Sequence, residues 1–299
     1  MTTRVLGDWG TTHLRLWLER EGTIVERLDG PGIGAIAAAP AMVLAEELEP
    51  WWKHGGVDAI VLCGMAGARN GLIEAPYVDC PAGRGEWGAG ALRRTFDGAA
   101  LIIGAGLATP LAGSPPDVMR GEEAQVFGAL ELVPALREGR HVALHPGTHS
   151  KWIWLEDGRI TGFRTVVTGE LFALLCRSSL LAAGGEPGKA DEDAGFAAGL
   201  ARAGGGSGVL AQLFETRAAQ LRLGRSAGWA TGFLSGLLIG HEVAEIAAAQ
   251  ALPPQLWLIG DPHLCDRYER ALAAHGIAAV QLDGEECVLA GLRSLHANA

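Results

Sequence analysis

The chain has 299 residues, of which 48% are hydrophobic and 19% are charged, and its formal net charge at pH 7 is −10. This length allows two domains of ordinary size, and the composition is that of a packed globular protein rather than a disordered one. The acidic balance argues against nucleic acid or an anionic membrane as a partner, because both attract a basic surface.

The cysteines and the start of the chain indicate the compartment. Five cysteines lie far apart in the sequence, and their number is odd. This pattern favours free, buried thiols in a reducing cytoplasm. The first residues contain no apolar signal core, and no apolar run reaches the roughly 18 residues that a membrane span needs. We therefore expect a cytoplasmic protein with no membrane partner.

Three strands are predicted at the start of the chain, over residues 4–7, 12–19 and 23–28. In the second of these, apolar and polar side chains alternate with a period of two, which is typical of an antiparallel strand. The next predicted element is a helix with one apolar side, made by Leu44, Leu48, Trp51 and Trp52. The apolar run at residues 57–63 predicts a buried parallel strand, whose carboxyl end at Gly64 is a usual place for a ligand.

A proline pair divides the sequence in two. Ser114-Pro115-Pro116 predicts a linker, because paired prolines disfavour both helix and central strand. We therefore expect one domain over residues 1–117 and another over residues 118–299. Both halves are predicted to have antiparallel strands followed by parallel α/β elements.

In the second half, a helix is predicted over residues 233–249. It is rich in small and aliphatic residues and is expected to be buried. His241 and Glu242 interrupt its apolar sequence. We expect core or hinge packing for these two side chains, with a role in the site as the alternative.

The turn Gly7-Asp8-Trp9-Gly10-Thr11-Thr12 lies between the first two predicted strands and has a second copy 137 positions later. That offset aligns Gly10-Thr11 with Gly147-Thr148, and Trp17-Leu18-Glu19 with Trp154-Leu155-Glu156. Five identities in phase, with the same turn chemistry, favour an internal duplication over two unrelated hairpins.

The residue types in this turn suggest a phosphate site. Glycine lets another group approach the backbone, successive N–H groups form a concave anion site, and threonine hydroxyls add donors. The residues that would form it are Gly10, Thr11 and Thr12 in the first turn and Gly147 and Thr148 in the second. Asp8 would repel a bare phosphate, so a hydrated Mg²⁺ is expected between them. Hairpins without any ligand also use such turns.

The two turns differ at one position, because the offset places His145 where the first turn has Asp8. One turn would then hold the metal and the transferred phosphate, and the other turn the remaining phosphates. This pattern resembles the actin, hexokinase and Hsp70 ATPase superfamily. The resemblance implies an α/β fold with two ribonuclease H-like (actin-like ATPase) domains flanking a nucleotide cleft, with ATP as cofactor. It also implies that Gly260 and Asp261 take the place of the adenosine motif.

A sugar kinase also needs a carboxylate base near the attacking hydroxyl and the phosphate. Glu122 lies 25 residues before Gly147, in the sequence Gly121-Glu122-Glu123. This resembles the Gly-Asp-Gln motif of the carbohydrate-kinase branch and implies that Glu122 is the catalytic base. The longer glutamate side chain leaves Glu123 open as the base. Without the resemblance, acids in a first helical turn are simply favoured by the helix dipole.

Further segments are more specific. They are GDWGTTHLRLWL (7–18), MRGEEAQ (119–125), HPGTHSKW (145–152), FRTVVTGEL (163–171) and FLSGLLIGHE (233–242). Together they resemble the 2-dehydro-3-deoxygalactonokinase family over nearly the whole chain. The resemblance implies ATP-dependent phosphorylation of the 6-hydroxyl of 2-dehydro-3-deoxy-D-galactonate in galactonate catabolism. A related kinase for another sugar or sugar acid, and a non-catalytic ATP-binding sensor of the same fold, are the alternatives.

The sugar-acid substrate needs its own contacts. Its carboxylate calls for a cationic site, for which Arg164 and Arg120 are the candidates, each with a structural ion pair as the alternative. Lys151 is expected either to reach a phosphate or to be a solvated strand lysine. Thr168 and Glu170 would bind sugar hydroxyls from a helix start, or Thr168 would serve as an ordinary helix cap. The sequence leaves a homodimer open.

Overall fold

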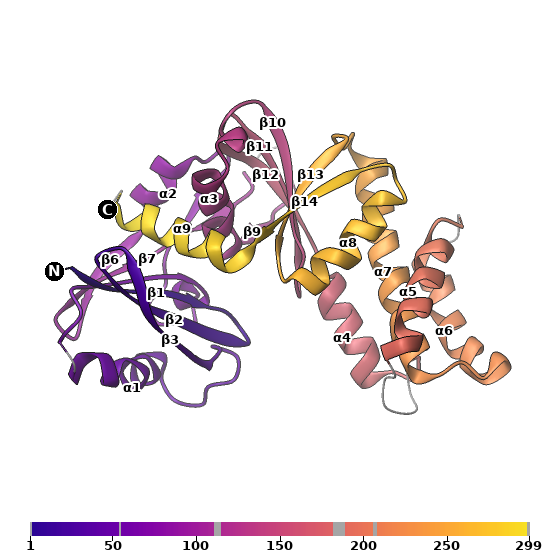
Figure 1. Cartoon of the computed structure of the whole chain (residues 1–299), viewed down its shortest axis with the longest axis horizontal. Coiled ribbons are helices and arrows are strands. Elements are labelled where there is room, and N and C mark those ends of the chain that lie inside the picture. Colours follow the sequence, from indigo (N-terminus) through magenta and orange to yellow (C-terminus); the bar gives the residue numbers. More distant parts are fainter. Residues whose placement is uncertain (1, 54, 111–114, 182–188, 206–207, 298–299) are drawn as a thin grey trace. The chain divides into compact units, whose positions relative to one another are not determined.

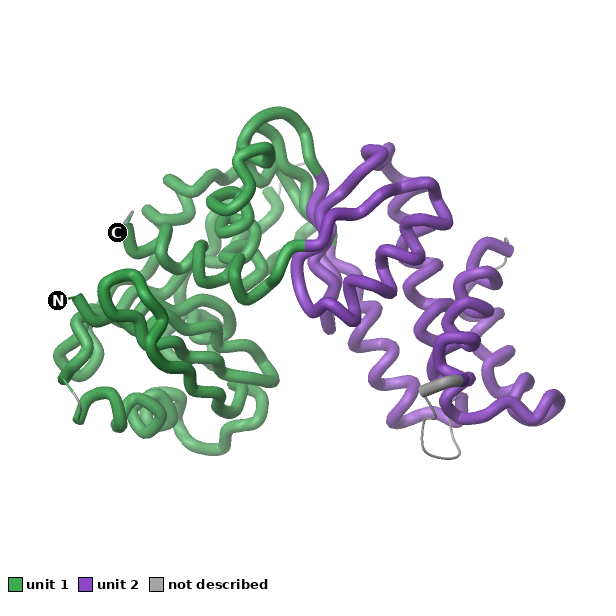
Figure 2. The backbone as a smooth tube through the Cα atoms, in the orientation of Figure 1, with its two compact units in different colours: residues 1–141, 153–164, 282–299 green, residues 142–152, 165–281 purple. Residues whose placement is uncertain are grey.

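The computed structural model describes residues 2–53, 55–110, 115–181, 189–205 and 208–297. The chain divides into two compact units, which Figure 2 shows in green and purple. Unit 1 comprises residues 1–141, 153–164 and 282–299, and unit 2 comprises residues 142–152 and 165–281. The domain boundary that we expect after residue 117 stays a prediction. Ser114 of the predicted linker lies outside the described residues.

A six-stranded sheet in the order β3-β2-β1-β4-β7-β6 forms the frame of unit 1 (Figure 1). Its strands are β1 (Thr3–Trp9), β2 (His13–Arg20), β3 (Thr23–Pro31), β4 (Ala59–Gly64), β6 (Leu92–Phe96) and β7 (Ala99–Ile103). β1 pairs antiparallel with β2 and parallel with β4, and β4 pairs parallel with β7. The three predicted strands at the start of the chain are confirmed.

Helix α1 (Pro40–Lys53) packs its predicted apolar side into the core of unit 1. Leu44, Leu48 and Trp51 are buried there together with side chains of β1, β2 and β4. Every residue of β4 is buried, which confirms a parallel strand covered on both faces. β4 ends in a single 3-10 turn, η1 (Met65–Gly67).

The segment of residues 70–87 after η1 is rich in glycine and proline, but it is not irregular throughout. The structure has β5 (Tyr77–Asp79) and the start of α2 (Arg84–Gly90) in this region. β5 joins β8 (Gly106–Ala108) and β9 (Val118–Met119) in a small sheet. These elements are too short, and too rich in glycine and proline, to give a periodic pattern in the sequence.

A second sheet has five strands in the order β12-β11-β10-β13-β14. They are β10 (Arg140–His145), β11 (Ser150–Glu156), β12 (Arg159–Val166), β13 (Gln255–Gly260) and β14 (Ala278–Asp283). β13 is parallel to β10, as β4 is to β1. The third, second, first, fourth and last strands of each set therefore follow the same spatial order. This shared topology confirms the duplication that the repeated turn predicted.

Helices α3 (Glu122–Leu132) and α9 (Gly284–Ala297) pack closely in unit 1. A carbon added at Gly128 would overlap the carbonyl oxygen of Cys287, and one added at Gly291 would overlap that of Ala124. The two backbones are therefore in direct contact. The 3-10 helix η2 (Pro134–Arg137) then leads into β10.

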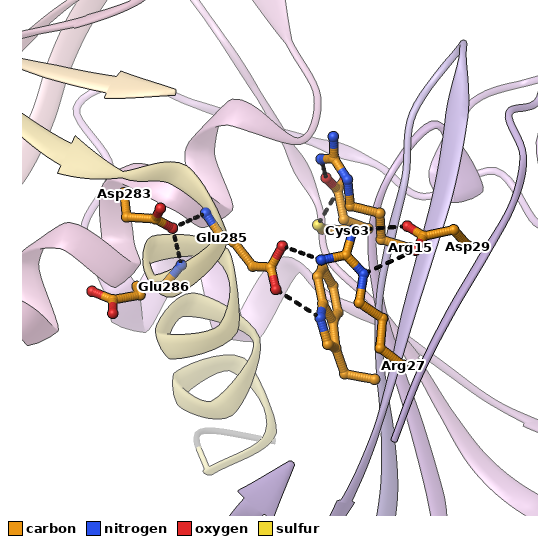
Figure 3. Close-up of polar contacts among 9 residues, drawn as sticks. Arg15, Arg27, Asp29, Cys63, Asp283, Glu285 and Glu286 are labelled. Carbon is orange, nitrogen blue, oxygen red and sulfur yellow. Dashed lines mark hydrogen bonds and ion pairs between the residues drawn. The ribbon is translucent and has the colours of Figure 1, made fainter. Parts of the chain in front are cut away.

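Polar contacts also tie α9 to the first sheet, as Figure 3 shows for Glu285. Its carboxylate accepts hydrogen bonds from Trp17 Nε1 at 3.2 Å and from Arg27 Nη1 at 2.7 Å. The buried Glu19 carboxylate accepts a hydrogen bond from Arg293 Nε at 2.6 Å. The last helix of the chain thus completes the unit that the first strand begins.

Unit 2 contains a layer of helices around α7. They are α4 (Thr168–Ser178), α5 (Lys189–Ala203), α6 (Val209–Leu223), α7 (Ala227–Ala249) and α8 (Pro262–Ala273). α7 packs against the other four. It begins before the predicted residue 233, because Ser226 caps it by accepting a hydrogen bond from Trp229 N. α5 contacts α7 without intervening side chains, since a carbon added at Gly232 or Gly236 would overlap a carbonyl oxygen of α5.

α7 is long and apolar enough to cross a membrane by length and composition, so the expectation that no segment reaches that length is wrong. However, 67% of its most apolar window is buried inside the protein. Its glutamate, Glu242, is also buried. These features are those of a core helix in unit 2.

Candidate functional site

The first Gly-Thr turn joins β1 to β2 and is held by backbone contacts. Gly10 N–H donates to the carbonyl of His13 at 2.8 Å, and Thr11 and Thr12 are exposed at the tip. The chain after β3 packs on this turn: Gly34 N–H donates to Thr11 O at 2.9 Å. A carbon added at Gly32 would overlap the Thr11 backbone. A glycine is therefore required where the two segments meet.

The second turn, between β10 and β11, is built in the same way. The chain after β12 packs on it, with Glu170 N–H donating to Thr148 O at 2.8 Å. A carbon added at Gly169 would overlap the carbonyl oxygen of Gly147. Gly169 lies 137 positions after Gly32, so the repeat includes a second glycine contact that the sequence analysis missed.

Asp8 lies near the end of β1, beside the first turn. It pairs across the hairpin with Arg15, whose Nη1 is 3.5 Å from Asp8 Oδ2. The thiol of Cys63, in the neighbouring β4, donates to Asp8 Oδ1 at 3.7 Å. Burial raises the pKa of the Asp8 carboxyl, Arg15 opposes this shift, and the charge of Glu122 adds to it. The side chain is still 17% exposed, so it is accessible to a small ion.

Glu123 is enclosed at the start of α3. The preceding Gly121 has a φ of 117°, and its N–H donates to both carboxylate oxygens of Glu123, at 2.8 and 2.7 Å. Glu123 is fully buried. Burial, and next the charge of Glu122, raise the pKa of Glu123 to about 8. Glu123 thus has the raised pKa that a general base can have, but its buried carboxyl group is not accessible to a substrate.

Glu122 differs from Glu123 in its surroundings. It is half-buried, and its carboxylate accepts a hydrogen bond from Arg120 N at 3.2 Å. Its charge acts on both the Asp8 carboxyl and the Cys63 thiol. Glu122 and Asp8, predicted from separate motifs, therefore belong to one cluster in unit 1.

This cluster fits a magnesium ion held jointly with phosphate. Among the described residues, no group of three or more His, Cys, Asp or Glu side chains could hold a metal by itself. Mg²⁺ is commonly bound by one or two carboxylates together with substrate phosphates and waters. A cation beside Asp8 would also relieve the repulsion between its carboxylate and that of Glu122.

Arg120 has an unusual environment for an arginine. Its Nη2 donates to Ala75 O at 2.8 Å, and its guanidinium carbon lies 4.2 Å from the centroid of the Tyr77 ring. In the described part of the chain, its buried Nε and Nη1 atoms have no hydrogen-bond partner. Unsatisfied buried donors are costly, so this guanidinium is suited to an anionic ligand. The other candidate, Arg164, is exposed on β12.

Two of the three predicted site residues near the second turn of unit 2 have surroundings that exclude one of their alternatives. Lys151 is only 4% exposed, so the solvated-lysine alternative is wrong. The N-cap of α4 is Val167, so the capping prediction for Thr168 is also wrong; the Thr168 hydroxyl instead hydrogen-bonds to Glu242. Glu170 is exposed and lies 2.7 Å from His149 Nε2.

Gly260 and Asp261, at the end of β13, lie beside the second turn. Gly260 has a φ of 151°, and a carbon added there would lie 3.5 Å from Pro146 O. Asp261 is the N-cap of α8, and its carboxylate accepts a hydrogen bond from Leu264 N at 3.1 Å. The Asp261 carboxylate therefore serves the helix end.

A small pocket adjoins the second turn in unit 2. It has about 70 Å³ of room for the centres of water molecules. The residues that line it are Gly147, Thr168, Gly169, Phe172, Ser235, Leu238, Ile239, Leu264, Arg267 and Tyr268. One part of the wall is apolar and the other carries hydroxyls and a guanidinium, a combination that suits a small organic ligand.

The comparisons with known proteins agree on one family. A sequence model of 2-keto-3-deoxy-galactonokinase matches residues 8–295. The 2-dehydro-3-deoxygalactonokinase of Escherichia coli K12 is 37% identical, with 100% of both chains covered. The chain belongs to the 2-keto-3-deoxy-galactonokinase family. Membership confirms the predicted kinase that transfers phosphate to a sugar acid, and it implies ATP as the donor.

Solved structures confirm the fold of this family member. The crystal structure of a Sinorhizobium meliloti protein assigned as a 2-dehydro-3-deoxygalactonokinase is 34% identical and has a TM-score of 0.86, covering 99% of this chain and 96% of that one. Component A of the Acidaminococcus fermentans (R)-2-hydroxyglutaryl-CoA dehydratase is 15% identical, with a TM-score of 0.53 and coverages of 100% and 99%. The second likeness concerns the fold alone. The predicted actin-like ATPase fold is thereby confirmed.

The sequence analysis missed several side chains around the two Gly-Thr turns. Arg15 and Cys63 contact Asp8, and His149 contacts Glu170. Arg15 could have been found, because a hairpin that turns at residues 10–12 pairs position 8 with position 15. Cys63 and His149 carry no comparable signal, since their partners depend on strand neighbours and on the path of α4.

Proposed function

We propose that this kinase uses ATP to phosphorylate the 6-hydroxyl of 2-dehydro-3-deoxy-D-galactonate, as a step of galactonate catabolism. The observation that carries the proposal is the cluster in unit 1, in a chain of this family. It combines an accessible carboxylate, Glu122, with a second carboxylate, Asp8, and with the unsatisfied guanidinium of Arg120. These groups match the base, the cation site and the carboxylate site that the reaction needs.

In the proposed reaction, Glu122 takes the proton from the 6-hydroxyl as that oxygen attacks the γ-phosphorus of ATP. The new oxygen–phosphorus bond forms while the bond between the γ-phosphorus and the bridging oxygen breaks, and ADP leaves. Glu122 is preferred over Glu123 because the Glu123 carboxylate is fully buried and accepts both its hydrogen bonds from Gly121. A base must reach the proton that it removes.

Arg120 is proposed to bind the substrate carboxylate. Its buried Nε and Nη1 atoms are two charged donors without a hydrogen-bond partner among the described residues, and a carboxylate would supply the acceptors that they lack. The stacked Tyr77 ring and the bond to Ala75 O would hold the guanidinium in place. Arg164 is the weaker candidate because exposure to water lowers the gain from a new ion pair.

Phosphate binding is assigned to the two turns, through Thr11, Thr12 and Thr148 and the backbone of Gly10 and Gly147. A bound Mg²⁺ would be held at Asp8 and would neutralise phosphate charge. Lys151 stays a candidate for phosphate contact, and Gly260 and Asp261 for the adenosine. Glu170 stays a candidate for a sugar hydroxyl, while Thr168 is disfavoured because its hydroxyl is bonded to Glu242. The cytoplasmic location also stays a prediction.

The substrate is tested by ADP release over a panel of 2-keto-3-deoxy acids, aldonates and neutral sugars, each measured against ATP alone. We expect the largest kcat/KM with 2-dehydro-3-deoxy-D-galactonate, and a 6-phosphate product by NMR. A larger kcat/KM with another acid would keep the kinase and replace the substrate. In the Arg120→Met variant, KM for the acid should rise by about 100-fold, since charged hydrogen bonds to the carboxylate are lost. An unchanged KM would remove Arg120 from the carboxylate site.

A further inference from the structure

A buried carboxylate that the proposed chemistry does not use lies in unit 2, behind the second turn. Glu242, on α7, is 3% exposed. Its Oε1 accepts a hydrogen bond from Trp152 Nε1 at 2.8 Å, and its Oε2 accepts one from the Tyr268 hydroxyl at 2.6 Å. Trp152 lies on β11 and Tyr268 on α8, so one side chain joins three elements.

Two hydroxyls extend this network. Ser150 Oγ lies 3.4 Å from Glu242 Oε2 and 2.7 Å from the Tyr268 oxygen. The Thr168 hydroxyl, at the first residue of α4, also hydrogen-bonds to Glu242. All five side chains are buried, and the network spans β11, α4, α7 and α8.

The attachment points lie on both sides of the second Gly-Thr turn. Ser150 follows that turn by two residues, and Thr168 begins the helix that packs on it. That helix contacts the turn through the bond from Glu170 N to Thr148 O and through the close approach of Gly169 to Gly147. Glu242 thus holds both segments that fix the position of the turn. Thr168 and Tyr268 also line the pocket beside it.

Burying a carboxylate in this space costs free energy, because the group loses its hydration. Burial raises the pKa of Glu242, although its hydrogen-bond donors oppose the shift. Replacing a buried charged group by well-packed apolar residues is often neutral or stabilising in other proteins. What an apolar residue could not do is fix the directions of several donors at once. The network therefore suits a role in geometry rather than in stability alone.

We propose that Glu242 is a positioning residue for ATP, which sets the second Gly-Thr turn and the start of α4 in the arrangement that receives phosphate groups. This inference rests on the proposed function, because it assigns the second turn to ATP. Glu242 touches neither substrate in this account. It acts through Ser150 and Trp152 on one side of the turn and through Thr168 on the other.

The test compares Glu242→Gln with a matched buried variant. Glutamine keeps the shape but brings an NH₂ group where Tyr268 and Ser150 now donate, so the network must reorganise. We expect KM for ATP to rise about tenfold, because a tenfold change corresponds to the net free energy of roughly one hydrogen bond. KM for the sugar acid should change less than twofold. Tyr268→Phe, which removes the 2.6 Å bond with little change in volume, should shift KM for ATP in the same direction.

The control is Gln212→Leu. Gln212 is also fully buried in unit 2, bonded to Arg202 O at 3.2 Å and to His241 at 2.6 Å, but none of these residues belongs to the second turn. It should lower Tm without raising KM for ATP. If Glu242→Gln and Tyr268→Phe lower Tm and leave KM for ATP unchanged, Glu242 is merely structural and the inference is wrong.

The inference and the proposed function fail in different ways. Phosphorylation of a different acid by the wild type, with KM for ATP still raised in Glu242→Gln, would replace the substrate and keep the role of Glu242. Normal turnover of the proposed acid, with an unchanged KM for ATP in Glu242→Gln and Tyr268→Phe, would do the reverse. If Glu242→Gln does not fold, calorimetric titration of Tyr268→Phe with the non-hydrolysable analogue AMPPNP decides. A Kd equal to that of the wild type would overturn the inference.

Discussion

The two Gly-Thr turns of this kinase share a backbone and differ in the carboxylate that accompanies it. In each, a glycine after the third strand packs on the turn, and a backbone N–H donates to the carbonyl of Thr11 or Thr148. At the first turn the acid is Asp8, which belongs to the strand and is 17% exposed. At the second turn the acid is Glu242, which comes from a helix and is 3% exposed.

This difference in exposure separates two uses of a carboxylate. A partly exposed carboxylate can still gain a ligand, and the neighbouring Glu122 makes a cation favourable beside Asp8. A sealed carboxylate can only organise the donors around it, as Glu242 does. If both proposals hold, the two copies of the duplicated unit share the backbone of the Gly-Thr turn. The first copy then binds the metal and the transferred phosphate, and the carboxylate of the second copy fixes the position of its turn.

The largest effect is expected for Glu122→Gln, which removes the proposed base from the first turn's cluster. Turnover should fall by roughly 10³-fold, within the range for losing a general base, while the Kd for ATP stays within twofold. Initial rates of ADP release and titration calorimetry measure the two quantities. Glu123→Gln is the matched control and should keep most of the activity. If the two variants exchange these results, Glu123 is the base and the assignment made here is wrong.

Asp8→Asn tests the asymmetry of the turns directly. Loss of the Asp8 carboxylate should reduce turnover about 100-fold at a fixed Mg²⁺ concentration, because a carboxylate ligand becomes a neutral amide. It should also raise the Mg²⁺ concentration that is needed for the half-maximal rate. His145→Asn changes the equivalent position of the second turn and should leave the Mg²⁺ requirement as in the wild type. A rate profile against Mg²⁺ for both variants gives the answer. Equal Mg²⁺ requirements in the two variants would show that Asp8 does not hold the metal.

The next prediction concerns how the stability of the protein depends on pH, through the buried carboxyl group of Glu123 beside Glu122. Burial raises its pKa in the folded protein to about 8, above its ordinary value of 4.5, so the folded state favours the protonated form. The stability this provides is fully present below pH 4.5 and is lost as the pH rises towards 8. The free energy of unfolding should therefore lose roughly 2 kcal/mol between pH 5 and pH 7 through this group.

Urea unfolding at several pH values checks this prediction, with Glu123→Gln as the comparison. The glutamine variant cannot ionise, so it should lack this part of the pH dependence and gain stability relative to the wild type as the pH rises. Parallel curves for the two proteins would mean that Glu123 is ionised in the folded state at neutral pH.

The smallest effect is expected for the glycine contact that both turns share. Gly169→Ala should raise KM for ATP by roughly tenfold or less, because the added carbon overlaps Gly147 O and must displace the turn. Gly32→Ala should act similarly at the first turn. Gly208→Ala is the control, since nothing lies within 4 Å of the added carbon and its φ is −64°. Steady-state kinetics over a range of ATP concentrations will show whether both contacts matter equally.

The sequence predicted the parts of this molecule that depend on local pattern. Strand alternation, the apolar run of β4 and the Gly-Thr repeat each follow from neighbouring residues, and the shared strand order confirms the repeat. The repeat also placed Asp8 and His145 at equivalent positions. The clustering of Asp8 with Glu122 was expected only through the family resemblance, because it depends on how β1 and α3 are placed in unit 1.

Side-chain roles in unit 2 were harder to predict, because they depend on tertiary neighbours. Thr168 looked like a helix cap, but a buried acid on α7 accepts its hydroxyl. For Lys151 a solvated position was one of two alternatives, yet its neighbours Ser150 and Trp152 face Glu242, so strand alternation places it on the opposite, covered face. In each case the residue type was compatible with two roles, and only packing chose between them.

The return of α9 to the first sheet sets an order of events during synthesis. Both ends of the chain belong to unit 1 (Figure 2), and Glu19 bonds to Arg293, which is 274 positions away. Until α9 has been synthesised, the glycine face of α3 has no partner and Trp17 lacks its bond to Glu285. The unit that contains the proposed catalytic cluster therefore cannot be completed before α9 has been synthesised.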